Sequence, residues 1–259
     1  MSSICVRNLR KVFENKRGEC LTVLDGINFE VDAGEFTCFL GPSGCGKSIL
    51  LQIIANLVPP TSGEINIGEA SSGIKGCTIG FVFQNPRLIP WMTVEGNIEY
   101  ILKTRKMPKV EREEKIGGVL TTLDLYDFRK YYPHQLSGGM QQRVSIARVL
   151  AYDAGIILMD EPFSHLDEIT ARTLRRELVD LWRQTRKTIL FVTHDILEAC
   201  FLGSKIILLT PKPTQVSRVM SINLSHPREY GNEELFSKER EVLIAFEDSL
   251  NQRGKNINE

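Results

Sequence analysis

The chain has 259 residues, 42% of them hydrophobic, so it can bury a large core as one domain or as a domain with a subdomain. Its 32 lysines and arginines balance its 32 aspartates and glutamates, which argues against nucleic acid or anionic lipid as its partner. No apolar run approaches the roughly 20 residues of a membrane span, and the N-terminus lacks a signal-peptide segment. With six cysteines that show no metal-ligand spacing, these features predict a cytoplasmic protein.

Predicted strands and helices alternate along most of the chain. Residues 21–34 alternate and turn as an antiparallel edge sheet would. Continuous apolar runs then predict strands of a parallel sheet that is covered on both faces. These runs are 37–40, 79–83, 156–159, 189–193 and 206–209. A crossover helix is predicted from the helical spacing of Leu174, Leu178, Leu181 and Trp182. The order predicts an α/β fold with a mainly parallel sheet and an N-terminal antiparallel β subdomain.

Residues 85–135 interrupt this alternation with charge-rich helical segments that carry no strand signal, and they predict an inserted α-helical subdomain. The core domain is expected to comprise residues 1–84 and 136–224, ending in a strand that starts near Val216. The remaining residues, 225–259, are predicted to form a short C-terminal helix and tail.

A glycine-rich loop lies between the first parallel strand and a helix-like run. It consists of Gly41, Pro42, Ser43, Gly44, Cys45, Gly46, Lys47 and Ser48. The glycines let backbone N–H groups surround an anion, and the helix adds its positive N-terminal end. Lys47 would reach the β- and γ-phosphates of a nucleotide, and Ser48 would bind Mg²⁺. A simple turn is the alternative, which the flanking strand and helix disfavour.

Four further polar residues follow predicted strands directly, and ligands of open parallel sheets bind at such carboxyl ends. Asp160 would hold Mg²⁺, and Glu161 would act as general base toward the attacking water; the alternative is that both cap the next element. Gln84 is either a turn residue or a contact to the metal or the water. His194 is either a surface histidine or a hydrogen-bond donor to the γ-phosphate.

Ser137, Gly138 and Gly139 form a second candidate anion site. Ser137 can cap the N-terminus of a helix, and the glycines permit close approach of a ligand to the backbone. The buried stripe of this helix is predicted to be Met140, Val144, Ala147 and Leu150. An ordinary capped helix is the alternative. Two phosphate-binding helix starts in one chain are most economically explained if each shares a nucleotide with a second copy.

At this point the sequence resembles the nucleotide-binding subunit of an ATP-binding-cassette transporter. GPSGCGKS resembles the Walker A motif, IILMDE the Walker B motif with catalytic Glu161, and LSGGM the signature motif. Gln84 falls at the Q-loop, SHLD (164–167) at the D-loop and His194 at the switch. The motifs stand in family order from about residue 4 to 220. The resemblance implies a RecA-like P-loop NTPase core that hydrolyses ATP with Mg²⁺.

The resemblance also implies how nucleotide is held. Phe13 stands where the family stacks an aromatic ring on adenine. In a head-to-tail dimer, with a second copy or a related cassette subunit, the segment 137–139 would contact the ATP bound to the opposite Lys47. Ile49 replaces the hydroxyl residue that usually follows Ser48, and this can remove a contact to the α-phosphate.

Membrane partners are implied as well. Integral membrane permease subunits would dock near Gln84 and the helical subdomain, so the chain would lie on the inner face of the cell membrane. Arg87, Pro90 and Trp91 either form this docking edge or pack inside the helical subdomain. FVFQNPRLIPWMTVEGNI and ILLTPKPTQV resemble importers of nitrate, sulfonates and taurine, to which an extracytoplasmic substrate-binding protein delivers the solute.

Two other functions are compatible with these motifs. An importer of another small molecule would share every motif, and a regulatory cassette protein would bind ATP without hydrolysing it. Cassette proteins of DNA or ribosomes usually carry two cassettes or basic extensions, and a small-molecule kinase would lack the segment 137–143. Met140 and His165 depart from the commoner glutamine and alanine of the family. Cys45 is expected to be a small packing residue whose modification by thiol reagents inactivates the protein unless ATP is bound.

Overall fold

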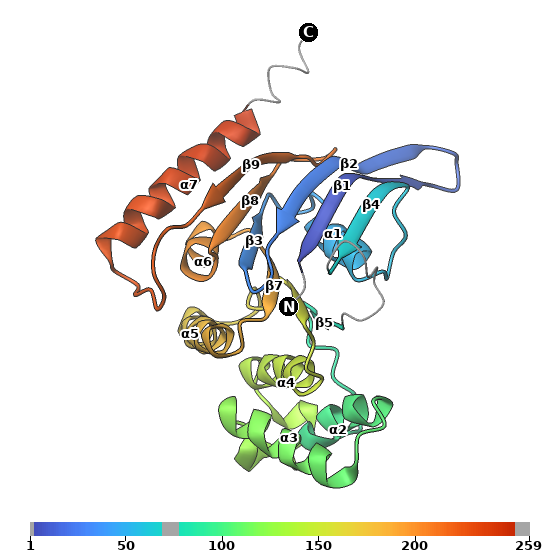
Figure 1. Cartoon of the computed structure of the whole chain (residues 1–259), viewed down its shortest axis with the longest axis vertical. Coiled ribbons are helices and arrows are strands. Elements are labelled where there is room, and N and C mark those ends of the chain that lie inside the picture. Colours follow the sequence, from blue (N-terminus) through green and yellow to red (C-terminus); the bar gives the residue numbers. More distant parts are fainter. Residues whose placement is uncertain (1–2, 69–77, 252–259) are drawn as a thin grey trace.

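The computed structural model describes residues 3–68 and 78–251, so Cys77 and the predicted tail lie outside the described part. Two sheets carry the fold (Figure 1). The larger has the order β5-β6-β7-β3-β8-β9 and the smaller the order β2-β1-β4. The larger sheet comprises β3 (Phe36–Leu40), β5 (Ile79–Val82), β6 (Ile156–Asp160), β7 (Thr188–Thr193), β8 (Lys205–Leu209) and β9 (Val216–Ser221).

The larger sheet is parallel except for β9, which runs antiparallel to β8. Every residue of β3, β6 and β7 is buried, as expected for strands covered on both faces. The five predicted parallel strands are therefore confirmed, with small changes at their ends. Phe83 lies outside β5, whereas Asp160 still belongs to β6.

The smaller sheet pairs β1 (Ile4–Glu14) with β2 (Cys20–Val31) and β4 (Ser62–Ile67), both antiparallel. Antiparallel pairing around residues 21–34 is confirmed, but β1 and β4 were not predicted. The pairing of β1 with β2 shifts register three times between Val6 and Val12, and these irregularities disturb the alternation that marks a strand in sequence.

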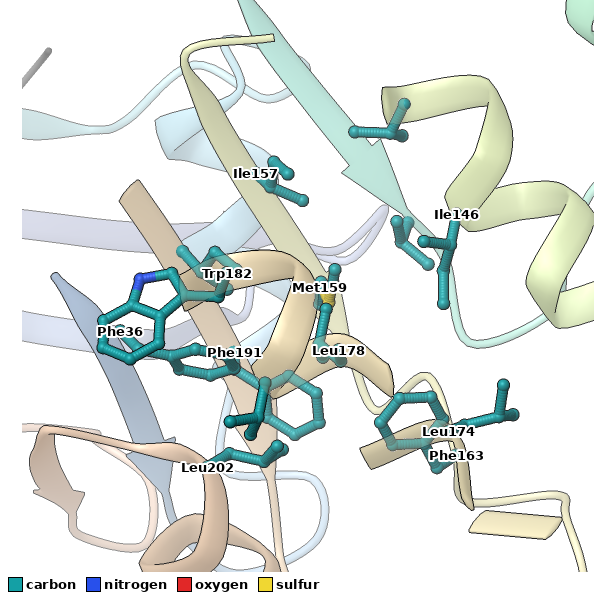
Figure 2. Close-up of a cluster of buried hydrophobic side chains, with 14 of the residues drawn as sticks. Phe36, Ile146, Ile157, Met159, Phe163, Leu174, Leu178, Trp182, Phe191 and Leu202 are labelled. Atoms are coloured by element: carbon teal, nitrogen blue, oxygen red, sulfur yellow. The ribbon is translucent and has the colours of Figure 1, made fainter. Parts of the chain in front are cut away.

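Different elements cover the two faces of the larger sheet. On one face α1 (Lys47–Ile54) lies between the sheets, where Leu50 and Leu51 join a core with Val6, Phe39 and Leu158. The other face is covered by α5 (Glu168–Thr185), α6 (Ile196–Leu202) and α7 (Glu233–Asn251). The predicted crossover helix is α5, and Figure 2 shows its Trp182 and Leu178 beside Phe36 and Phe191 of the sheet.

Residues 85–135 contain helices and no strand, as expected (Figure 1). They are α2 (Val94–Thr104), α3 (Lys109–Thr122) and the short 3₁₀ segments η1 (Tyr126–Phe128) and η2 (Pro133–Gln135). The next helix, α4 (Gly138–Ala151), contacts α2, α3, α5 and β5. Its predicted buried stripe was too narrow: Met140 and Leu150 are only partly buried, whereas Ile146 and Val149 are buried because α4 packs on several sides. None of the described helices is both long and apolar enough to cross a bilayer.

Candidate nucleotide-binding site

The carboxyl ends of β3, β5, β6 and β7 lie at one edge of the larger sheet, because these strands are parallel. The register places Leu40 beside Thr193, and Asp160 beside Val192. The glycine-rich loop, Gln84, Glu161 and His194 therefore all leave the sheet at this edge, as the sequence predicted.

The glycine-rich loop has the backbone geometry of an anion cradle. Gly44 and Gly46 have φ angles of 74° and 116°, in the left-handed region that favours glycine. A Cβ on Gly46 would also lie 2.7 Å from Val23 Cγ1, so a larger residue would be both strained and crowded. Gly46 precedes α1 and no side chain caps this helix start in the described structure, which leaves its N–H groups for an anion.

A contact that sequence reasoning missed anchors this loop from behind. The Thr214 hydroxyl donates a hydrogen bond to the Cys45 carbonyl, and Thr214 N–H donates to Val23 O at 2.8 Å. Thr214 lies between β8 and β9, so the last strand pair supports the loop. The Cys45 thiol is buried, and burial raises its pKa despite nearby Lys47. It packs in the core as expected.

Lys47 is 4% exposed, and it contacts both the loop and the turn after β6. Its Nζ donates to the carbonyls of Gly41 at 2.8 Å and Pro42 at 3.0 Å. The same atom lies 3.4 Å from Glu161 Oε1. The one buried cation of the loop is thus directed at the site by backbone carbonyls and a carboxylate.

Ser48 and Asp160 present oxygen atoms to each other. The Ser48 hydroxyl donates to Asp160 Oδ1 at 2.8 Å. Burial raises the pKa of Asp160 and Glu161 adds to this effect, while the Ser48 hydrogen bond and Lys47 oppose it. A hydroxyl and a carboxylate are the hard oxygen donors that Mg²⁺ takes, and a divalent cation would offset the cost of burying this charge.

Glu161 stands between two strand ends. Its φ of 42° is unusual for a residue with a side chain, and its N–H donates to Val192 O at 3.0 Å. This bond ties the turn after β6 to β7. Glu161 Oε2 consequently lies 3.0 Å from Nδ1 of His194, which follows β7 and is exposed.

Gln84 reaches the site through Ser164 of the SHLD segment. Gln84 Nε2 donates to Ser164 Oγ at 3.1 Å, and Ser164 Oγ donates to the Glu161 carbonyl at 3.0 Å. Its amide thus lies on the Glu161 side of the site, and the described contacts do not bring it to Ser48 or Asp160. A metal contact from Gln84 stays a prediction.

Phe13 lies on β1, 38% exposed, at a hollow of about 350 Å³ beside the glycine-rich loop. Predicted residues Phe13 and Ile49 line this hollow with the loop. Sequence reasoning missed three other lining residues, Leu21, Val23 and Lys212. Leu21 is the partner of Phe13 in the register of β1 and β2, a relationship that the irregular β1 pattern concealed.

Ser137, Gly138 and Gly139 lie elsewhere on the molecule. Ser137 caps α4, its hydroxyl accepting from Met140 N at 3.3 Å. A Cβ on Gly139 would lie 2.6 Å from Thr170 Cγ2, so glycine lets α4 begin against the start of α5. Figure 1 places α4 well apart from α1, so these residues do not join the glycine-rich loop of the same chain.

The site combines a glycine loop before a helix, a serine and an aspartate at hydrogen-bond distance, and a glutamate between a lysine and a histidine. This combination is typical of a P-loop nucleotide hydrolase. The sequence matches the ABC transporter family over residues 24–164. The chain belongs to this family, and it is an ATP-binding protein of the ABC type.

Several known proteins are similar to this chain in sequence and in structure. The nitrate import ATP-binding protein NrtD of Synechocystis is 39% identical, over 98% of this chain and 96% of that protein. The aliphatic sulfonates import ATP-binding protein SsuB of Bacillus subtilis is 41% identical, over 90% of each. A dimeric ATP-binding cassette solved in a post-hydrolysis state with ADP and Pi superposes with a TM-score of 0.74 at 34% identity, covering 86% of this chain and all of that one.

Proposed function

We propose that this chain binds and hydrolyses ATP to energise an ABC importer of a small solute of the nitrate, sulfonate or taurine type. One observation carries the chemical part: Glu161 lies within 3.4 Å of Lys47 and 3.0 Å of His194, beside the phosphate loop. The solute class is supported by the likeness to NrtD and SsuB over at least nine-tenths of the chain.

The binding roles are assigned by position. The N–H groups of residues 41–48 and the Lys47 ammonium would hold the β- and γ-phosphates, while Phe13 would stack on the adenine. Ser48 and Asp160 would hold Mg²⁺, which supplies positive charge to the phosphate oxygens when bound. Gln84 is assigned to the metal or the water, and Ile49 lines the nucleotide pocket without a hydroxyl.

The catalytic roles follow from charge. Glu161 would accept a proton from the water that attacks the γ-phosphorus, because its carboxylate lies beside the phosphate loop and can act as a general base. His194 would hold this carboxylate through Oε2 and donate to the γ-phosphate. Lys47 can shift from the carbonyls of Gly41 and Pro42 to the phosphate, where it would offset developing negative charge.

A dimer would complete the site. Ser137, Gly138 and Gly139 form a capped helix start that is separated from the phosphate loop of its own chain. In a head-to-tail pair, these residues would contact the ATP that is bound to the opposite Lys47. The likeness to a dimeric cassette solved with ADP and Pi supports such a pair, with an identical or a related subunit.

Permease subunits are assigned to the helical side, where residues 85–135 would form a subdomain joined to the core of 1–84 and 136–224. A hollow of about 320 Å³ there is lined by Phe83, Arg87, Ile101, Arg148 and Tyr152, among others. Trp91 is 76% exposed, which favours a docking edge over packing inside the subdomain. The chain would then lie at the inner face of the membrane, with a separate substrate-binding protein outside.

A phosphate-release assay tests the proposal on the purified chain and on its complex with the permease. Mg²⁺-dependent release from ATP is expected, and Lys47→Ala should abolish it. If the chain binds ATP but releases no phosphate, either alone or in the complex with the permease, it would instead be a regulatory cassette. Uptake of labelled nitrate, taurine or an alkanesulfonate into vesicles with the complex tests the solute class.

A further inference from the structure

The His194 loop is held by one buried hydroxyl. Thr193, the last residue of β7, is 2% exposed. Its Oγ1 donates to Glu198 of α6 and accepts from the N–H of Asp195 at 3.0 Å. Both bonds join Thr193 to residues beyond His194 in sequence, and they therefore restrict the backbone that carries the His194 ring.

Behind this hydroxyl lies a buried ion pair. Glu198 Oε1 lies 2.9 Å from Arg175 Nε, and both side chains are 6% exposed. Arg175 of α5 also reaches Glu168 at 3.3 Å and Asp195 at 3.9 Å. A cavity of about 170 Å³ is lined by this pair together with Glu161 and His194, so the network and the reactive carboxylate face one space.

The segment 222–230, here termed the C-terminal strap, holds the network from the other side. Arg175 Nη1 lies 3.4 Å from the Tyr230 hydroxyl, and the Tyr230 ring stacks on Phe201 of α6 at 4.3 Å. Arg228 is 6% exposed and donates to several backbone carbonyls at the end of α6 and in the strap itself. These belong to Cys200, Phe201, Gly203, Ile222 and Leu224.

We propose that Thr193, Glu198 and Arg175 are positioning residues that hold the His194 ring against Glu161, and that the C-terminal strap completes this support through Tyr230. The inference deepens the proposed function and rests on it for its kinetic consequence. A buried charge pair would be costly unless both groups were held and bonded, and here the bonds converge on the loop next to the reactive carboxylate.

The first test compares Thr193→Val with Thr193→Ser in the full chain. Valine keeps the shape and removes the hydroxyl, whereas serine restores it. We expect Thr193→Val to lower kcat for ATP hydrolysis about tenfold, because small displacements of a reacting group can cost about a hundredfold. KM should stay within about twofold, since the proposed contacts of Phe13 and of the phosphate loop to the nucleotide are unchanged. Thr193→Ser should be close to wild type.

A double-mutant cycle separates positioning from general destabilisation. In a His194→Ala background, Thr193→Val should cause no further fall in kcat, because the group that it positions is gone. Tyr230→Phe, which keeps the ring on Phe201, should lower kcat about threefold through loss of one hydrogen bond. The inference would be overturned if Thr193→Val lowered kcat by the same factor with and without His194. It would also be overturned if Thr193→Val did not lower kcat in a chain that hydrolyses ATP.

A second measurement does not require turnover. The imidazole ¹⁵N resonances of His194 should shift or broaden in Thr193→Val, and they should remain unchanged in Thr185→Val. Thr185 is exposed at the far end of α5, and its hydroxyl donates to Leu181 O at 2.9 Å, so Thr185→Val controls for the loss of a threonine hydroxyl remote from His194. Unchanged His194 resonances in Thr193→Val would overturn the positioning role even in a chain without hydrolysis. If the wild-type chain does not hydrolyse ATP, this result would count against the proposed function and not against the positioning role.

Discussion

Glu161 Oε1 lies 3.4 Å from Lys47 Nζ, which joins the turn after β6 to the first residue of α1. Both side chains are largely buried, so the surrounding protein screens their attraction less than water would. A phosphate that draws Lys47 toward itself removes this cation from Glu161. Nucleotide binding and the position of the Glu161 carboxylate are therefore expected to be coupled.

Replacement of Glu161 by Gln tests this coupling. The amide keeps the shape but cannot accept a proton, so phosphate release should fall about 10²- to 10⁴-fold. ATP affinity should be kept or increased, because Lys47 no longer has a competing carboxylate. Size-exclusion chromatography with ATP should show an accumulated ATP-bound dimer. Normal phosphate release from Glu161→Gln would refute the general-base assignment.

Phe13→Ala should weaken nucleotide binding. Stacking of a base on an aromatic ring contributes about 1–3 kcal/mol, so Kd for ATP should rise about 5- to 150-fold. Turnover at saturating ATP should change little, since Phe13 is assigned to the adenine and not to the reacting phosphate. Titration calorimetry measures Kd, and Phe13→Tyr, which keeps the ring, is the control. Equal affinities of the Ala and Tyr variants would exclude stacking.

Thiol reagents should modify Cys45 slowly. Its side chain is 2% exposed and burial raises its pKa, so little thiolate is available, whereas Cys20 is exposed. We expect N-ethylmaleimide to label Cys45 at least about tenfold more slowly than Cys20, and ATP to slow it further. Peptide mass spectrometry measures both rates. The Cys45→Ala variant should resist inactivation; loss of its activity at the wild-type rate would assign the effect to another cysteine.

Stability below neutral pH should depend on His226. Burial, together with nearby Arg228, lowers its pKa from 6.5 to about 4, and its Nε2 lies 3.1 Å from Leu202 O. The unfolded chain takes up this proton first, so the contribution of His226 to stability is complete above pH 6.5 and is lost as the pH falls to about 4. The loss amounts to at most about 3 kcal/mol.

Urea unfolding at pH 7 and pH 4.5 measures this loss. Carboxylates also titrate in this range, so the comparison with His226→Gln is essential: glutamine can donate to the same carbonyl and takes up no proton between pH 7 and pH 4.5. The decrease in unfolding free energy should be smaller in His226→Gln than in wild type. Equal decreases in both proteins would show that His226 does not control the transition.

The sequence predicted the parallel strands well because these strands are buried on both faces and read as continuous apolar runs. β1 was missed because its pairing shifts register repeatedly, and α4 proved more widely buried than one helical stripe. The Thr214 support of the phosphate loop was also missed. Its two partners, Val23 and Cys45, are far from it in sequence, and no spacing rule connects them.

Local spacing along the chain predicts the kind of chemistry, since it governs which groups leave a strand end or begin a helix. Lys47, Asp160 and His194 were predicted in this way. The folded structure shows which groups meet: Lys47 and His194 contact different oxygens of Glu161, and Arg175 and Glu198 lie behind the histidine. Strand order and helix packing set these distances between segments remote in sequence, and local patterns carry no information on either.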